Sequence, residues 1–212
     1  MNIHSEKEGK VSRGDKEGLI RQAAIRVFAR EGFHQARMET IAHEAGVAVG
    51  TIYNYFESKK DVLLSVFEAE LEERISFFEE LRESGLSVPE QIAQILQGYF
   101  SLLQENTELA QVLLRERFNP EKGFKDKLSD FHRKVVERIE VLIQEGIDQG
   151  WVRSCNPRII APALFAVVQS IGVWEMIHPG TVVRELFQTA PNELADFIWN
   201  GLKKGESDEE RD

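Results

Sequence analysis

The chain has 212 residues, of which 42% are hydrophobic and 29% charged, and its formal net charge is −10. These fractions are typical of a soluble globular protein with one large or two small domains. The sequence contains no apolar run of about 18 residues and no apolar signal-peptide core, so we expect neither a membrane span nor secretion. The single cysteine, Cys155, excludes an internal disulfide and a cysteine-based metal site. We therefore expect a cytoplasmic protein.

The negative charge is concentrated in the second part of the chain. Residues 1–64 carry ten Lys or Arg against nine Asp or Glu, whereas residues 65–212 carry sixteen against twenty-seven. Proteins that bind nucleic acid usually present a basic surface, because the phosphate backbone dominates affinity. The near-neutral first part does not exclude this function. It does require that such a site depend on a few well-placed cations.

Apolar residues recur three and four positions apart through most of the chain, which predicts helices. In the first part we expect helices from Leu19 to Gly32, Glu39 to Ala45, Gly50 to Tyr55 and Ser58 to Gly85. Further helices are expected at 88–105, 107–117, 121–149, 157–178 and 191–203, with a shorter helical turn near 181–188. No segment shows the alternation of a strand. The predicted fold class is therefore all-α, with about nine helices, and the polar segments 1–14 and 205–212 are expected to be disordered.

The most informative segment is a pair of short predicted helices separated by a turn that contains Gly46. This arrangement is typical of a helix-turn-helix, in which the glycine allows the chain to end one helix and reverse into the next. On a helical wheel, Ile52 and Phe56 face inward. The opposite face consists of polar or small residues suited to a DNA groove: Gly50, Thr51, Asn54 and Tyr55. The alternative is a generic turn between two helices that pack in a core. The exposed face of an ordinary surface helix is normally rich in Lys and Glu, whereas this one carries Thr, Asn and Tyr, which disfavours that alternative.

The stretch from Arg21 to Leu64 resembles the DNA-binding domain of the TetR family of bacterial transcriptional regulators. The matching motifs are Ala-Ala-x-x-Val-Phe-Ala-x-x-Gly-Phe (23–33), Thr-Ile-Ala-x-x-Ala-Gly-Val (40–47) and Gly-Thr-Ile-Tyr-x-Tyr-Phe-x-Ser-Lys-x-x-x-Leu (50–63). The resemblance implies an N-terminal three-helix helix-turn-helix domain at 15–60. It also implies a larger helical ligand-binding and dimerisation domain at 61–204.

The resemblance also assigns roles within the first domain. Thr40 corresponds to a phosphate contact from the second helix. The third helix would face the groove with Val49, Gly50, Thr51 and Asn54, and backbone contacts would come from Tyr53, Tyr55 and Lys59. The family often has Ser where this chain has Ala48, so the third helix is expected to lack a side-chain N-cap.

For the second domain, the resemblance implies that the last two long helices pair with those of a second copy. A dimer would read two half-sites one DNA turn apart, in a palindromic operator. Both helices must also bury apolar residues within their own chain. The residues predicted for the dimer interface are Ile160, Leu164, Val167, Ile171, Phe197 and Ile198.

The middle of the chain is rich in phenylalanine, which would suit a long apolar ligand. The residues predicted to contact it are Phe78, Phe100, Leu103, Leu113, Arg117, Phe131, Phe165 and Trp174. Short segments (His34-Gln35, 99–103, 145–150 and 170–174) resemble the fatty-acid-degradation repressors of the family, which respond to long-chain acyl-CoA. Acyl-CoA is therefore the first candidate inducer. A hydrophobic or cationic drug-like compound, paired with Glu116 or Glu175, is the alternative.

No enzymatic motif is present. His43-Glu44 is not followed by the second histidine that a zinc-binding helix requires, and the segment from Gly46 to Gly50 lacks the lysine of a phosphate-binding loop. We therefore expect no catalytic residues, metal or cofactor. The predicted function is a repressor that binds double-stranded DNA as a homodimer and is released by a small molecule. A helical protein-interaction module is the alternative from another class.

Overall fold

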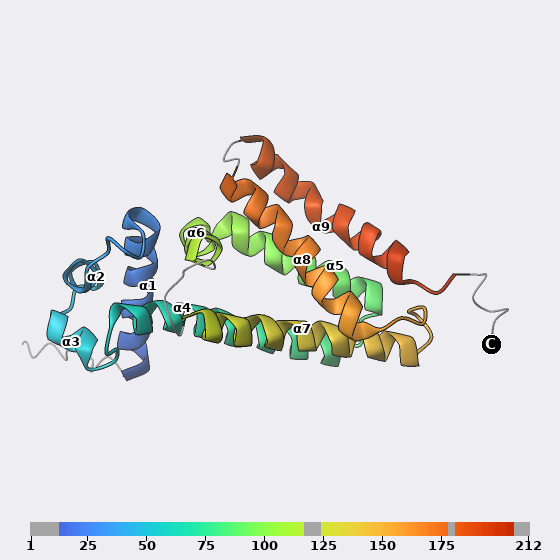
Figure 1. Ribbon diagram of the computed structural model, residues 1–212, viewed down its shortest axis with the longest axis horizontal. Coiled ribbons are helices and arrows are strands. Elements are labelled where there is room, and N and C mark those ends of the chain that lie inside the picture. Colours follow the sequence, from blue (N-terminus) through green and yellow to red (C-terminus); the bar gives the residue numbers. More distant parts are fainter. Residues whose placement is uncertain (1–12, 117–123, 178–180, 206–212) are drawn as a thin grey trace, which may run out of the picture. The chain divides into compact units, whose positions relative to one another are not determined.

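The computed structural model describes residues 13–116, 124–177 and 181–205, and these form nine helices (Figure 1). Within them there is no strand, only an isolated bridge between Val152 and Lys203. The all-α prediction is confirmed. The helices are α1 (Arg13–Glu31), α2 (Met38–Ala45), α3 (Val49–Tyr53), α4 (Lys59–Glu83), α5 (Val88–Glu105), α6 (Thr107–Glu116), α7 (Phe124–Asp148), α8 (Pro157–Ile177) and α9 (Thr181–Leu202).

The chain divides at Val66 into two compact units, six residues beyond the boundary expected from the sequence. Helix α4 therefore begins in the first unit and continues into the second. Most of the polar ends that we expected to be disordered lie outside the described residues. Arg13, Gly14 and Gly205 do not, and the first two of these belong to α1.

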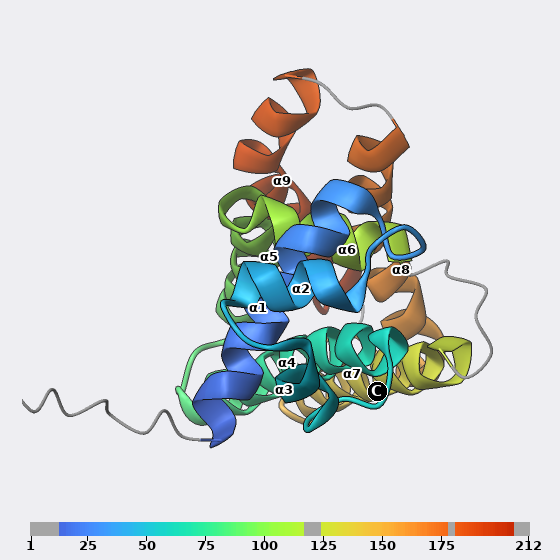
Figure 2. The ribbon, with the colours of Figure 1, turned by 90° about the vertical axis from the view of Figure 1, so that its left-hand side faces the viewer.

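The first unit is held together by the apolar face of α1. Ile20, Ala24 and Phe28 have no exposed surface, and neither do Ile41 of α2 and Ile52 of α3. Figure 2 shows α2 crossing α1, with which it is in extensive contact. A helix as short as α3 is not stable by itself in water, so it depends on this packing for its shape.

The start of α4 is tied to the loop between α1 and α2. Lys59 Nζ donates hydrogen bonds to the carbonyl oxygens of His34, at 3.0 Å, and Ala36, at 2.8 Å. The same ammonium lies 4.7 Å from the ring centroid of Phe33. Ser58 caps the helix as expected, since its Oγ accepts a hydrogen bond from the Asp61 backbone N–H at 3.3 Å. Lys59, which we predicted to contact DNA phosphate, thus has a structural role in the first unit.

In the second unit, α5 packs along α9, and α7 packs along α8. Helices α8 and α9 form an antiparallel pair (Figure 1). The main core includes Leu96, Phe100, Ala161 and Leu202, each no more than 3% exposed. A smaller cluster joins α4 to α7 through Leu71, Phe78 and Val135.

Helix α9 differs from the sequence prediction of a short turn at 181–188 and a separate helix at 191–203. It runs without a break through Pro191. A proline inside a helix removes one backbone hydrogen bond and usually interrupts the helix. Here Phe187 and Ala190, just before the proline, are 4% and 8% exposed and belong to the main core, as does Ile198 beyond it. Packing on both sides of Pro191 therefore outweighs the local preference.

The anchoring of Lys59 leads to a prediction about stability. Lys59→Ala should loosen the loop between α1 and α2, because two carbonyl oxygens lose a charged donor that contributes about 1.5 kcal/mol. Hydrogen exchange of the amides in residues 32–37 should accelerate roughly tenfold. Lys16→Ala, which removes the same charge from α1, serves as the control. Unchanged exchange in this loop, together with weakened DNA binding, would mean that Lys59 acts only as a DNA contact.

Candidate functional site

The turn between α2 and α3 has the geometry of a helix-turn-helix. Gly46 adopts a left-handed conformation, with φ of +67°, and its N–H donates to the His43 carbonyl at 3.1 Å. Val47 N–H donates to the Ala42 carbonyl at 3.0 Å and completes the end of α2. Glycine takes this conformation without the steric cost that a side chain would add. Ala48 precedes α3 and makes no side-chain capping bond, as the sequence predicted.

Helix α3 presents one face to the core and one to solvent. Ile52 and Phe56 point inward, with exposed fractions of 0% and 6%, as the helical wheel predicted. The helix ends at Tyr53, earlier than expected, and Asn54 is its C-cap. Space around Gly50 is open, since a Cβ added there would meet no atom within 4 Å. Of the predicted DNA contacts, Gly50, Tyr53 and Asn54 are exposed, whereas Thr40, Val49, Thr51, Tyr55 and Lys59 are half-buried.

Several cations of the first unit are engaged in ion pairs within the unit. Arg26 Nε lies 2.7 Å from a carboxylate oxygen of Glu44, and Arg30 lies 3.6 Å from the other. The hydrogen bond from Arg26 lowers the pKa of Glu44. These contacts connect α1 to α2. Helix α3 itself contains no Lys or Arg. Its exposed face presents polar groups and an open backbone rather than a dense positive charge.

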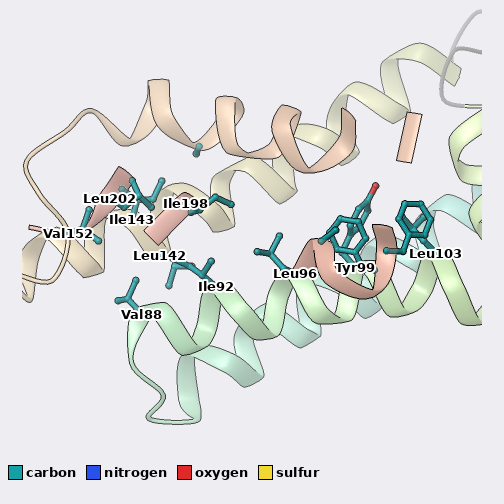
Figure 3. Close-up of a cluster of buried hydrophobic side chains, with 14 of the residues drawn as sticks. Val88, Ile92, Leu96, Tyr99, Leu103, Leu142, Ile143, Val152, Ile198 and Leu202 are labelled. Atoms are coloured by element: carbon teal, nitrogen blue, oxygen red, sulfur yellow. The ribbon is translucent and has the colours of Figure 1, made fainter. Parts of the chain in front are cut away.

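The second unit contains a cavity of about 620 Å³ that is partly open to solvent, and its volume is within the range typical of small-molecule sites. Figure 3 shows part of its wall, a row of α5 side chains facing others from α7 and α9. Most of the lining is aliphatic or aromatic. It includes Phe77, Phe78, Val88, Ile92, Ile95, Leu96, Val135, Ile139, Leu142, Ile143, Val152, Leu164, Phe165, Val168, Ile198 and Leu202.

A few polar side chains interrupt this apolar wall. Glu70 and Arg74 of α4 form an ion pair at 2.5 Å, and their side chains are 8% and 19% exposed. Burial raises the pKa of Glu70, and the positive charge of Arg74 opposes that effect. The Arg74 guanidinium lies 5.5 Å from the ring centroid of Tyr99, whose hydroxyl is 3.4 Å from Gln169 Oε1. These four residues all line the cavity.

The residues predicted to contact the ligand have different locations. Phe78 and Phe165 line the large cavity, whereas Leu103, Leu113 and Phe131 line a smaller one of about 40 Å³. Phe100 is fully buried and packs against Phe187, so it is a core residue and lines neither cavity. Trp174 is 55% exposed. Arg117 lies outside the described residues.

Of the acidic and basic groups near the predicted ligand contacts, those that the structure describes are not in the cavity wall. Glu116 is 6% exposed and pairs with Arg115 at 3.2 Å, but it lines neither cavity. Arg133 pairs on the surface with Asp130 and Glu137. The side chain of Glu175 lies outside the described part of the chain. Sequence reasoning did not single out Glu70 and Arg74, because they stand in a strongly charged part of α4 where nothing distinguishes them from Glu68, Glu72 and Glu73.

Helices α8 and α9 leave apolar side chains exposed. Ile159, Trp174, Ile177 and Phe197 are 65%, 55%, 60% and 67% exposed. Of the residues predicted for the dimer interface, only Phe197 belongs to this exposed set. Val167 is half-buried, and the other four pack within their own subunit: Ile160, Leu164 and Ile171 lie against the main core, and Ile198, 5% exposed, is part of it.

The apolar character of α8 also bears on the sequence-based exclusion of a membrane span. The segment Pro157–Trp174 has a mean hydropathy of 1.4. By its length and composition alone, it could cross a membrane. Only 11% of it is buried. One such helix is weak evidence for a span, because the apolar face of a subunit interface has the same composition.

Comparison with known proteins matches both units to one family. Residues 20–66 match the model of the bacterial regulatory proteins of the tetR family, and residues 85–175 match that of the tetracyclin repressor-like C-terminal domain. The fatty acid metabolism regulator protein of Bacillus subtilis is 30% identical over 159 residues, covering 74% of this chain and 82% of that protein.

Solved structures agree. FadR from Bacillus subtilis in complex with stearoyl-CoA superposes with a TM-score of 0.74 at 27% identity, over 87% of this chain and 98% of that one. FadR from Bacillus halodurans, a fatty acid degradation regulator, gives a TM-score of 0.76 at 26% identity, over 90% and 97%. These relatives are transcriptional regulators and not enzymes. The chain belongs to the TetR family of bacterial transcriptional regulators.

Proposed function

We propose that this protein is a transcriptional repressor that binds a palindromic operator as a homodimer and is released by a long-chain acyl compound, with acyl-CoA as the first candidate. The large apolar cavity of the second unit carries the proposal, because it suits a long hydrocarbon chain and lies in a TetR-family chain. The stearoyl-CoA bound to the related Bacillus subtilis FadR supports this choice of ligand. Such a regulator acts in the cytoplasm.

In this proposal α3 enters the major groove. Asn54 offers donor and acceptor groups to base edges, and the open backbone at Gly50 allows close approach. Tyr53, 52% exposed, reaches phosphate with its hydroxyl. Because positive charge is scarce on this face, we expect one subunit alone to bind its half-site weakly. When two linked subunits bind two half-sites together, the affinity of the dimer for the operator exceeds that of either subunit.

Dimerisation buries the exposed apolar side chains of α8 and α9. Ile159, Trp174, Ile177 and Phe197 would otherwise remain in contact with water at a cost of about 25 cal/mol per Å². The proposed interface consists of these four side chains and omits Ile198, because Ile198 is already buried in the main core of its own subunit. Two-fold symmetry then brings the same face of each subunit into contact, as in most homodimers.

Helix α4 offers a route from ligand to DNA. It lines the cavity with Glu70, Arg74 and Phe77, and its first residue, Lys59, is bonded to the loop that precedes α2. A ligand that displaces α4 would therefore act on an element that both units share. Release requires that the ligand bind the DNA-incompetent state more tightly than the DNA-competent state.

Two other functions compete with this proposal. A multidrug-type repressor is favoured by Glu70, Glu73 and Glu80, three carboxylates in the cavity lining that a hydrophobic cation would meet. A helical protein-interaction module would use the acidic surface and would need no operator. A test of DNA binding distinguishes the interaction module from the proposed repressor. The identity of the inducer distinguishes the multidrug-type repressor from it.

The experiment starts from duplexes enriched by in vitro selection on the full-length protein. Asn54→Ala should weaken binding of the selected sequence about tenfold per half-site, because a good base contact discriminates by about 1–3 kcal/mol. Gln22→Ala, an exposed amide change on α1, is the control. Stearoyl-CoA should release the duplex in fluorescence anisotropy, and an aromatic cation should not. Release by the cation alone would favour the multidrug reading, and no enrichment of any sequence would argue for the interaction module.

The dimer is tested with Phe197→Glu, which places a charge in the exposed apolar face of α9. Light scattering after size exclusion should show a monomer, because burying an unpaired carboxylate costs several kcal/mol. Operator affinity should fall with it. Trp151→Glu makes a comparable change at a side chain that is 54% exposed but lies outside α8 and α9, and it should remain a dimer. A dimeric Phe197→Glu would place the interface elsewhere.

A further inference from the structure

The large cavity is chemically different at its two ends. Along α5, Tyr99 lies at one end and Val88 at the other, separated by eleven residues or roughly 16 Å of helix (Figure 3). Glu70, Arg74 and Gln169 surround the Tyr99 end. At the Val88 end lie the aliphatic lining residues Leu142, Ile143, Val152 and Leu202.

The polar end offers hydrogen-bond donors. Arg74 Nε is buried and has no hydrogen-bond partner among the described residues. Buried polar atoms in native structures are almost always bonded, so such an atom suggests a missing acceptor. The Tyr99 hydroxyl donates to Gln169 Oε1 at 3.4 Å and so orients the Gln169 amide, whose NH2 group is a second kind of donor in the cavity wall.

The charge of the polar end is already balanced. Arg74 pairs with Glu70, which is 7% exposed, and Glu73 is the next carboxylate in the lining. A ligand carboxylate here would meet two like charges for one cation. A neutral acceptor, such as the carbonyl oxygen of an ester or thioester, accepts the same hydrogen bonds without that repulsion.

The aliphatic end is closed. Val88, Ile143, Val152 and Leu202 are each no more than 5% exposed. Packing behind them is tight, since a Cβ added to Gly146 would lie 2.6 Å from Val152 Cγ2. The exposed lining residues Glu73, Ser76, Glu80 and Gly98 belong instead to α4 and α5, and two of them directly adjoin Arg74 and Tyr99 in sequence. The cavity therefore meets solvent along α4, from the polar end to Glu80, which is six residues or roughly 9 Å of helix beyond Arg74.

We propose that a neutral acyl carbonyl binds at Arg74, Tyr99 and Gln169, and that the methyl end of the chain stops against Val88, Val152 and Leu202. This assignment rests on the proposed function, because it takes an acyl compound as the ligand. In this arrangement the two ends of the cavity recognise different parts of the ligand. The polar end selects the head-group chemistry, and the aliphatic end limits the chain length.

The two ends give different signatures in calorimetric titrations with saturated acyl-CoA esters, from decanoyl to eicosanoyl. Tyr99→Phe keeps the ring and removes the hydroxyl, so affinity should fall roughly fivefold at every chain length. Gln169→Leu should behave in the same way. Neither change should move the preferred length, because the far end of the cavity is untouched.

Val152→Ala should instead shift the preferred length upward, with affinity for the longer esters rising about fourfold for each methylene newly accommodated. Val88→Ala opens the same end from α5 and serves as a second variant if Val152→Ala does not fold. Val112→Ala is the matched control, since Val112 is 0% exposed and lines neither cavity. It should leave the preferred length unchanged.

The outcomes separate the two levels of the proposal. A native protein that binds neither the esters nor the free fatty acids would overturn the acyl ligand itself. If the esters bind but Tyr99→Phe moves the preferred length, or Val152→Ala and Val88→Ala weaken all lengths equally, the orientation is wrong. Tighter binding of free acids than of the esters would overturn the neutral carbonyl at Arg74.

Discussion

The second unit is built around a space that its own side chains do not fill. Protein interiors are normally packed as densely as organic crystals, so a partly open cavity of about 620 Å³ must be supported by contacts elsewhere. The pairing of α5 with α9 and of α7 with α8 provides them, through a core that includes Phe100 and Phe187. A ligand that fills the space adds contacts which the empty protein lacks, so binding stabilises the state that holds it.

The helix-turn-helix was predictable because its signals are local. Gly46 and the inward pair of Ile52 and Phe56 lie within a short stretch, and the structure places these three as expected, whereas Thr51 and Tyr55 of the predicted polar face are half-buried. Lys59 was less accessible to sequence reasoning. Its partners are backbone carbonyls more than twenty residues away, and no side-chain pattern marks a carbonyl as an acceptor.

The ligand and dimer residues were harder to assign, because periodicity identifies an apolar face but not what covers it. Phe78 lines the cavity, whereas Phe100 fills the core, although both follow the same helical spacing. Phe197 and Ile198 are neighbours in sequence, yet one is exposed and the other buried. In α9, we expected a gap between a helical turn near 181–188 and a helix at 191–203, whereas packing by Phe187 and Ala190 keeps the two in one helix.

Helix α4 belongs to both units, so it determines where the chain can be joined to another protein in a chimeric biosensor. A junction at residue 60 would cut between Lys59 and the apolar residues Val62, Leu63 and Val66, all of which are buried and belong to the first unit. The donated DNA-reading module would then lose part of its own core. A splice placed after Val66 would transfer that module whole, and the recipient helix would have to continue α4 in phase, since each residue rotates the following face by about 100°.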